Sequence, residues 1–120
     1  MRRMTVLLAD DYPLICEAIE RLLEPDFEVI DRVADGRTLV ARALELHPDL
    51  VLVDVGLPVV NGLEAARQLK NSIPQLKLIF LSMNADPEII REAFRIGASG
   101  YVLKNTMSEQ LLPAIHNAMQ

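Results

Sequence analysis

The chain has 120 residues, 51% of them apolar, so it is long enough to bury one core and too apolar for a disordered segment. The formal net charge of −5 argues against direct binding of nucleic acid, which requires a basic face. A single cysteine, Cys16, excludes an internal disulfide. No apolar run reaches the roughly 18 residues that span a bilayer, and the N-terminus lacks a signal-peptide pattern. These features predict a cytoplasmic domain with no membrane partner.

Five short apolar runs alternate with five helical patterns along the chain. The runs rich in valine, leucine and isoleucine are 5–9, 27–33, 50–53, 76–81 and 100–103. Three of them are nearly continuous in apolar residues, which is typical of strands buried on both faces. The run 27–33 alternates more and predicts an edge strand.

The helical patterns have recognisable start and stop residues. These are Pro13 and Pro25 around the first pattern, His47-Pro48 after the second, Asn61 and Glu64 at the start of the third, Asp86, Pro87 and Gly97 around the fourth, and Pro113 within the fifth, near 108–119. Proline at a first helical position and glycine just past the last are typical helix ends. Asn61 and Glu64 have the spacing of a capping box. Strands alternating with helices predict one α/β domain over 1–120, with a parallel sheet covered on both faces.

Polar side chains stand where the predicted strands end. The first strand ends in Asp10-Asp11, the third in Asp54, the fourth in Ser82 and the fifth in Lys104. Ligands of an open parallel sheet bind at the carboxyl ends of its strands. We therefore expect three carboxylates, a hydroxyl and an ammonium group to meet in one crevice.

Carboxylates placed this close repel one another, by roughly 4 kcal/mol for two unit charges about 4 Å apart at an effective dielectric near 20. A hard divalent cation relieves that repulsion, and oxygen ligands suit Mg²⁺. An aspartate can act as a nucleophile and carry an acyl phosphate, and phosphoryl transfer depends mainly on positioning and charge stabilisation. The strand ends therefore predict Mg²⁺-dependent transfer of a phosphoryl group to an aspartate, with Lys104 pairing with the phosphoryl oxygens.

Each of these residues also has an ordinary structural interpretation. Asp11 could cap the first helix, and Ser82 could bond to its local backbone. Asp54 could be a loop carboxylate and Lys104 a solvated surface lysine. A shared site is favoured because four independent explanations would otherwise have to coincide at four strand ends.

Taken together, these residues resemble the receiver domain of response regulators over essentially the whole chain. The matching segments are Leu-Ala-Asp-Asp-Tyr-Pro (8–13), Val-Leu-Val-Asp-Val-Gly-Leu-Pro-Val-Val-Asn-Gly (51–62), Phe-Leu-Ser (80–82) and Gly-Ala-Ser-Gly-Tyr-Val-Leu-Lys (97–104). The resemblance implies a flavodoxin-like, doubly wound sheet of five parallel strands in the order 2-1-3-4-5.

The resemblance also implies a role for each residue at the strand ends. By this resemblance, Asp54 is the phosphoacceptor. The direct Mg²⁺ ligands are Asp11, Asp54 and the backbone carbonyl of Gly56, and Asp10 holds the ion through water. Ser82 and Lys104 contact the phosphoryl group, and Tyr101 is an aromatic switch that moves with Ser82. An ordinary half-buried strand tyrosine is an equally open interpretation of Tyr101.

The details are closest to the NarL/LuxR-type subfamily, whose members usually carry a C-terminal helix-turn-helix domain. The implied partners are a histidine kinase and, on phosphorylation, a second copy of the chain. DNA would be contacted only through an output domain, which is absent from this chain. A stand-alone or phosphorylation-independent interaction module of the same fold is the alternative.

Three positions depart from the usual receiver pattern. Asn105 replaces a proline that often follows the lysine in a cis peptide, and a non-proline cis bond costs about 3–4 kcal/mol, so we expect that geometry to be lost. Met83 stands where a smaller residue is common and would narrow access to the acyl phosphate. Tyr12 replaces a frequent histidine.

Two other classes of protein fit less well. A phosphatase of the haloacid dehalogenase type requires a second aspartate two residues after the nucleophile, where this chain has Gly56. A flavodoxin-like cofactor binder requires a phosphate-binding loop after the first strand, and Asp10-Asp11 would repel a phosphate in the absence of a metal. We therefore expect a signalling phosphoacceptor rather than a metabolic enzyme.

Overall fold

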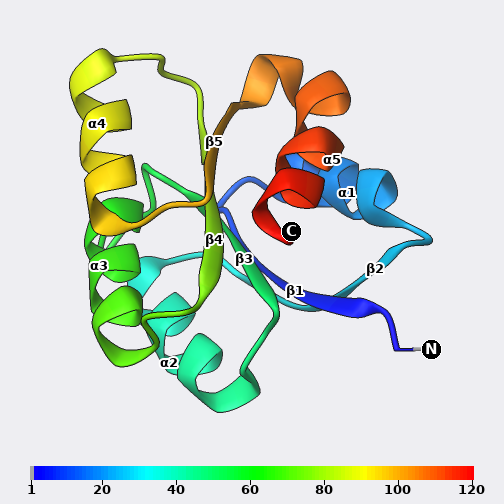
Figure 1. Cartoon of the computed structure of the whole chain (residues 1–120), viewed down its shortest axis with the longest axis horizontal. Helices are drawn as coiled ribbons and strands as arrows, with labels where there is room; N and C mark the ends of the chain where they lie inside the picture. Colours follow the sequence, from blue (N-terminus) through cyan, green and yellow to red (C-terminus); the bar gives the residue numbers. More distant parts are fainter. Residues whose placement is uncertain (1) are drawn as a thin grey trace.

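A computed structural model describes residues 2–120 as a parallel sheet between two layers of helices (Figure 1). Its elements are β1 (Met4–Ala9), α1 (Pro13–Leu23), β2 (Phe27–Val33), α2 (Gly36–Leu46), β3 (Leu50–Asp54), α3 (Gly62–Ser72), β4 (Lys77–Ser82), α4 (Pro87–Ile96), β5 (Gly100–Leu103), the 3-10 turn η1 (Lys104–Thr106) and α5 (Met107–Ala118). The strand order is β2-β1-β3-β4-β5 and all pairs are parallel, so the predicted fold class is confirmed. The alternating run 27–33 is an edge strand, as predicted.

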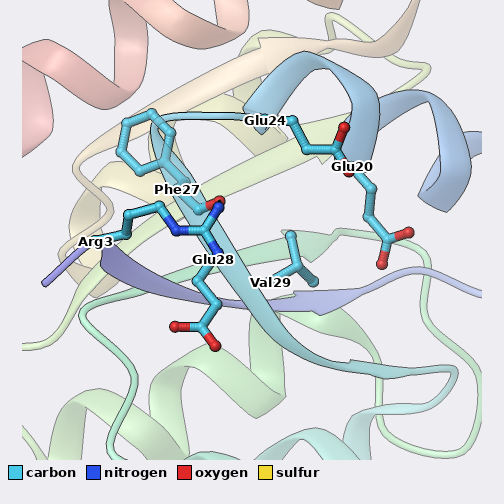
Figure 2. A pocket seen from close by; sticks show the side chains of 6 residues that line it. All are labelled: Arg3, Glu20, Glu24, Phe27, Glu28 and Val29. Carbon is cyan, nitrogen blue, oxygen red and sulfur yellow. The ribbon is translucent and has the colours of Figure 1, made fainter.

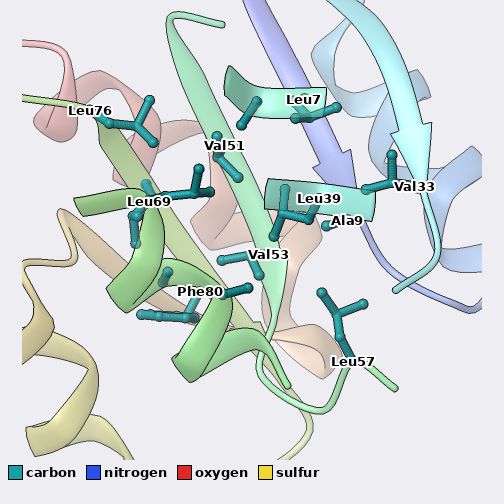
Figure 3. Packing of buried hydrophobic residues seen from close by; sticks show 14 of the residues in the cluster. Leu7, Ala9, Val33, Leu39, Val51, Val53, Leu57, Leu69, Leu76 and Phe80 are labelled. Carbon is teal, nitrogen blue, oxygen red and sulfur yellow. The ribbon is translucent and has the colours of Figure 1, made fainter. Parts of the chain in front are cut away.

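Successive residues of the central strands point to opposite faces of the sheet and build two cores. Leu7, Val51 and Phe80 lie in the core beneath α2 and α3 (Figure 3). Their neighbours Leu8 and Leu52 lie in the other core, beneath α1 and α5. Figure 1 shows α1 and α5 side by side on one side of the sheet, with α2, α3 and α4 on the other. Burial on both faces explains why these strands are almost continuously apolar.

Most helix boundaries follow the predicted signals. Pro13 and Pro87 begin α1 and α4, and Gly97 ends α4 in the left-handed conformation with φ 114°. The Asn61 side chain accepts a hydrogen bond from the Glu64 backbone N–H (3.0 Å), which is half of the expected capping box. The possible helix cap at Asp11 is wrong, because Tyr12 occupies the N-cap of α1 and makes no side-chain cap.

The chain after β5 turns through η1 before α5 begins at Met107, one residue earlier than the pattern indicated. Within residues 2–120 the cis peptide bonds comprise Glu24–Pro25 alone, so the bond between Lys104 and Asn105 is trans, as expected for a residue that is not proline. None of the helices described over that range is long and apolar enough to cross a membrane.

Asp49 ties the loop before β3 to the start of β1. Its carboxylate accepts hydrogen bonds from the Thr5 backbone N–H (2.8 Å), the Thr5 hydroxyl (3.1 Å) and the Arg2 guanidinium (3.0 Å). Pairing with Arg2, followed by the hydrogen bonds from Thr5, holds the pKa of Asp49 below its ordinary value. The ionised carboxylate therefore stabilises the folded chain above the pKa of an unfolded aspartate.

Replacing Asp49 with asparagine is expected to lower the free energy of unfolding by about 1 kcal/mol at pH 7. Because the folded pKa is lowered, the wild type should lose this contribution as the pH falls below about 4, and the two proteins should converge. Urea denaturation between pH 7 and pH 2.5 measures the difference. Asp26→Asn, at an exposed aspartate, is the matched control. A gap that stays constant across the pH range would contradict the assignment.

Candidate functional site

Three aspartates meet at the carboxyl ends of β1 and β3. Asp10 and Asp11 directly follow β1, and Asp54 is the last residue of β3. Each offers a carboxylate oxygen, and these oxygens lie within 4.8 Å of one another. Asp10 and Asp54 are buried, whereas Asp11 is exposed. The parallel pairing of β1 with β3 brings together residues that are more than forty positions apart in the sequence.

Lys104, at the end of β5, lies between two of these carboxylates. Its ammonium nitrogen is 2.6 Å from Asp10 Oδ2 and 3.3 Å from Asp54 Oδ1. The side chain is 3% exposed, so the interpretation of Lys104 as a solvated surface lysine is wrong. Burial alone would lower the pKa of Lys104, but attraction from Asp10 and Asp54 outweighs it and raises the pKa. The lysine is therefore a fixed positive charge beside Asp54.

The carboxyl group of Asp54 is partly desolvated, and this changes its pKa. Burial raises the pKa of Asp54, with a further contribution from Asp10, and these effects exceed the opposing attraction of Lys104. The Gly56 backbone N–H donates a hydrogen bond to Asp54 Oδ1 (3.3 Å), which orients the side chain. A carboxylate that is poorly solvated loses little water when it attacks an electrophile.

Ser82 and Tyr101 are joined through one peptide carbonyl. The Ser82 hydroxyl accepts a hydrogen bond from the Asn84 N–H (2.9 Å) and donates one to the Asn84 carbonyl (3.2 Å). The Tyr101 hydroxyl donates to the same carbonyl (2.7 Å). The structural interpretation of Ser82, a local backbone bond, therefore holds in this conformation, and Tyr101 is partly buried on β5. If Ser82 moved away from Asn84, the Asn84 carbonyl would accept a hydrogen bond from Tyr101 alone.

These residues surround a pocket of about 360 Å³ at the strand ends. Its lining residues are Asp11, Tyr12, Asp54, Val55, Gly56, Ser82, Met83, Asn84, Ile89 and Lys104. All four of the strand ends that carry polar residues thus contribute directly to one hollow, through Asp11, Asp54, Ser82 and Lys104. Asp10 does not line it and instead pairs with Lys104. The sequence did not single out Asn84, although its position two residues after Ser82 is a spacing at which a serine hydroxyl bonds to the backbone.

The charges of the pocket suit a hard divalent cation. Three carboxylates and one ammonium give a formal charge of −2, which is the sum of −3 and +1. Within residues 2–120, the Asp11 side chain has no hydrogen bond or ion pair, although it lies beside two other carboxylates. Oxygen-only ligands at these separations match the preference of Mg²⁺. The residues present therefore fit Mg²⁺, with Asp11 and Asp54 as the carboxylates that line the pocket.

Figure 2 shows a different pocket, of about 260 Å³, between α1 and the edge strand. Its lining residues are Arg3, Glu20, Glu24, Phe27, Glu28 and Val29. The Arg3 guanidinium donates hydrogen bonds to the carbonyls of Pro25 and Phe27, both at 3.4 Å. Because this pocket borders the first residues of β1 and β2, it lies at the end of these strands opposite to Asp10 and Asp11.

Comparison with known proteins agrees with this geometry. The response regulator receiver domain family matches residues 6–116. The transcriptional regulatory protein DegU of Brevibacillus brevis is 35% identical over 115 residues, which are 94% of this chain and 49% of DegU. The nitrate/nitrite response regulator protein NarL of Escherichia coli K12 is 34% identical over 116 residues, 95% of this chain and 54% of NarL. The chain therefore spans about half the length of these regulators.

Solved structures give the same result. A LuxR-family two-component response regulator from Aurantimonas sp. SI85-9A1 superposes with a TM-score of 0.92 at 30% identity, covering 98% of this chain and 86% of that one. The response regulator domain of Thermotoga maritima CheB superposes with a TM-score of 0.89 at 27% identity, covering 98% and 97%. Because the curated relatives are transcriptional regulators, a stand-alone interaction module is not favoured. The chain belongs to the receiver domain family of two-component response regulators and is of the NarL/LuxR type, a signalling domain rather than a metabolic enzyme.

Proposed function

We propose that Asp54 accepts a phosphoryl group, from the phosphohistidine of a histidine kinase or from a small phosphodonor. The observation that carries this proposal is a buried, poorly solvated carboxylate that lies beside a fixed ammonium group and two further carboxylates. Mg²⁺, held by Asp10 through water and by Asp11, Asp54 and the Gly56 carbonyl, would neutralise charge on the phosphoryl oxygens.

In this proposal each residue of the pocket has a defined task. Asp54 attacks phosphorus in line with the leaving group, and Lys104 pairs with a phosphoryl oxygen. Ser82 gives up its bonds to Asn84 and donates its hydroxyl to another phosphoryl oxygen. Tyr101 then no longer shares the Asn84 carbonyl with Ser82 and moves inward. The face formed by α4, β5 and α5 changes shape only when the phosphoryl contacts exist, which is a population shift between two states.

The consequence for the whole protein follows from its relatives. The chain 1–120 would be the regulatory domain of a cytoplasmic transcription regulator, with DNA bound by a C-terminal output domain that lies outside this chain. Phosphorylation would change its contacts with that domain or with a second copy. Hydrolysis of the acyl phosphate in the same pocket would return the domain to its resting state.

Intact mass spectrometry after incubation with acetyl phosphate tests the proposal. A gain of one phosphoryl group that requires Mg²⁺ is the expected result, and replacing Mg²⁺ with sodium chloride of equal ionic strength is the control. No mass gain with Mg²⁺ present would contradict the proposed chemistry. A gain that is equally large without a divalent cation would contradict the proposed metal site.

Binding of Mg²⁺ should also stabilise the fold. At ten times its dissociation constant, the ion is expected to raise the free energy of unfolding by about 1.4 kcal/mol, or the melting temperature by roughly 5 °C. Replacing Asp11 with asparagine should remove most of that rise. The metal-free melting temperature should not fall, since this exposed side chain has no bonded partner in the range 2–120, and should increase slightly because its repulsion with Asp10 and Asp54 is removed. Thermal melts with and without MgCl₂ measure both. An undiminished rise in Asp11→Asn would exclude Asp11 as a ligand.

A further inference from the structure

A second pocket adjoins the acid pocket and shares one wall with it. It has a volume of about 240 Å³ and is lined by Tyr12, Ile15, Met83 and Lys104. Three of these residues, Tyr12, Met83 and Lys104, also line the pocket that contains Asp54. The two hollows therefore meet at the pair Tyr12 and Met83, with Lys104 beneath them. We refer to the second hollow as the side pocket.

The side pocket is apolar where the acid pocket is charged. Tyr12 and Met83 are 61% and 77% exposed, a large apolar surface for two residues that lie beside a catalytic carboxylate. The Tyr12 ring lies with its centroid 5.6 Å from the Lys104 ammonium nitrogen, and its backbone N–H donates to Asp10 Oδ1 (2.9 Å). The contact with Lys104 is made by the ring itself, and Tyr12 also lines the acid pocket, so the ring lies at the mouth of that pocket.

The geometry of the proposed reaction places a donor's leaving group at this mouth. Asp54 lies at the base of the acid pocket, so an in-line attack sends the leaving atom away from it, toward the exposed rim. Tyr12 and Met83 form part of that rim. An organic group attached to the leaving atom that extends between Tyr12 and Met83 would enter the side pocket.

We infer that the side pocket is a leaving-group subsite, in which Tyr12, Ile15 and Met83 select phosphodonors whose leaving group carries a planar, apolar body. The inference rests on the proposed function and adds a substrate preference to it. A cavity of about 150 Å³ is enough to bind benzene in another protein, so a pocket of about 240 Å³ has room for one aromatic ring. The side pocket bears no carboxylate of its own among its lining residues, so it does not repel an anionic donor.

The reaction balances for an aromatic acyl phosphate such as benzoyl phosphate. The bond from an Asp54 carboxylate oxygen to phosphorus forms as the bond from phosphorus to the acyl oxygen breaks. The electron pair leaves with that oxygen and gives benzoate, without any proton transfer. Acetyl phosphate reacts in the same way and gives acetate. The two donors differ in the body of the leaving group and in its basicity, which is slightly lower for benzoate, so the reactivity of both donors without protein is the reference.

The test compares the rate constants for phosphorylation by benzoyl phosphate and by acetyl phosphate under identical Mg²⁺ conditions. We expect benzoyl phosphate to be preferred about tenfold, which is equivalent to about 1.4 kcal/mol and to burial of roughly 55 Å² of apolar surface. The preference should fall in Met83→Ala and in Tyr12→Ala toward the ratio at which the two donors react with hydroxylamine in the absence of protein. Leu14→Ala is the matched control, because this residue precedes Ile15 on α1, is 78% exposed and does not line the side pocket.

Each outcome decides between the possibilities. A preference that is lost in both variants and kept in Leu14→Ala supports the subsite. A wild-type ratio near the ratio without protein, or a ratio unchanged in both variants, overturns it while the proposed function stands. Equal acceleration of both donors in Met83→Ala would also overturn it, since Met83 would then act as a barrier to all donors. If neither donor modifies the wild type, the proposed function fails and the subsite fails with it.

Discussion

Replacing Asp54 with asparagine is expected to abolish phosphorylation, lowering the rate with acetyl phosphate and Mg²⁺ at least about a hundredfold. Asparagine has the same shape and can still accept the hydrogen bond from the Gly56 N–H, so the pocket should remain intact. It lacks the charged oxygen that attacks phosphorus and removes one of the three carboxylates that suit Mg²⁺. The loss would therefore reflect chemistry rather than unfolding.

Intact mass measured over time, together with a thermal melt, separates the two explanations. Asp35→Asn is the matched control, because Asp35 caps α2 by accepting from the Thr38 N–H (2.8 Å) and asparagine caps a helix equally well. Asp35→Asn should be phosphorylated at the wild-type rate. Full phosphorylation of Asp54→Asn would show that another residue is the acceptor.

The acidity of the pocket adds a pH dependence to this prediction. Because burial raises the pKa of Asp54 in the metal-free chain, that chain should hold less of the ionised carboxylate as the pH falls through that pKa. Protons should therefore compete with Mg²⁺, and the Mg²⁺ concentration that gives half the maximal rate of phosphorylation should rise on acidification at a higher pH than for an ordinary aspartate. A half-saturating Mg²⁺ concentration that does not change over that range would contradict a role for the desolvated carboxylate.

Replacing Gly62 with alanine is expected to be the most destabilising of the substitutions considered, at about 3 kcal/mol or more. An added Cβ would lie 2.0 Å from the backbone carbonyl oxygen of Asp54 and 2.9 Å from its carbonyl carbon. Neither atom is at the end of a flexible side chain, so the start of α3 must move away from β3. Native domains have only about 5–15 kcal/mol of stability in total, so the effect is a large fraction of it.

The same clash would disturb the reactive carboxylate, because the affected carbonyl belongs to Asp54 itself. Urea denaturation measures the loss of stability, and the phosphorylation rate reports on the position of Asp54. Gly56→Ala is the control for stability, since its added Cβ would have Asp54 Oδ2 at 3.9 Å, an ordinary contact, as its nearest neighbour. That variant should stay within about 0.5 kcal/mol of the wild type. Equal stability of the two alanine variants would contradict the close packing of α3 on β3.

Much of the fold follows from local patterns in the sequence. Continuous apolar runs identify β3 and β4 because a strand between two helical layers has no polar face. Pro87 and Gly97 delimit α4 because proline fits the first turn of a helix and glycine reaches the left-handed conformation at little cost. The candidate site was predictable in outline too, because polar residues that end parallel strands are brought to the same edge of the sheet.

Other features depend on which residues become neighbours after folding. Sequence alone allows Lys104 to be a solvated lysine, and only the packing of β5 and η1 buries its ammonium group against Asp10 and Asp54. Asp10 and Asp11 are adjacent in sequence but have opposite exposures. The Asp10 N–H still bonds to the Val33 carbonyl of β2 (3.0 Å), whereas Asp11 lies in the bend that follows.

The pairing of distant side chains is likewise a property of the tertiary structure. Ser82, at the end of β4, and Tyr101, on β5, meet at the Asn84 carbonyl. Tyr12 and Met83, which follow β1 and β4, line the same side pocket. Hydrophobic periodicity and the residues that start or end a helix determine the helices and strands, because they act over a few residues along the chain. Burial of charge and the shape of a pocket arise from the sum of contacts between elements, and these exist only once the sheet has been assembled.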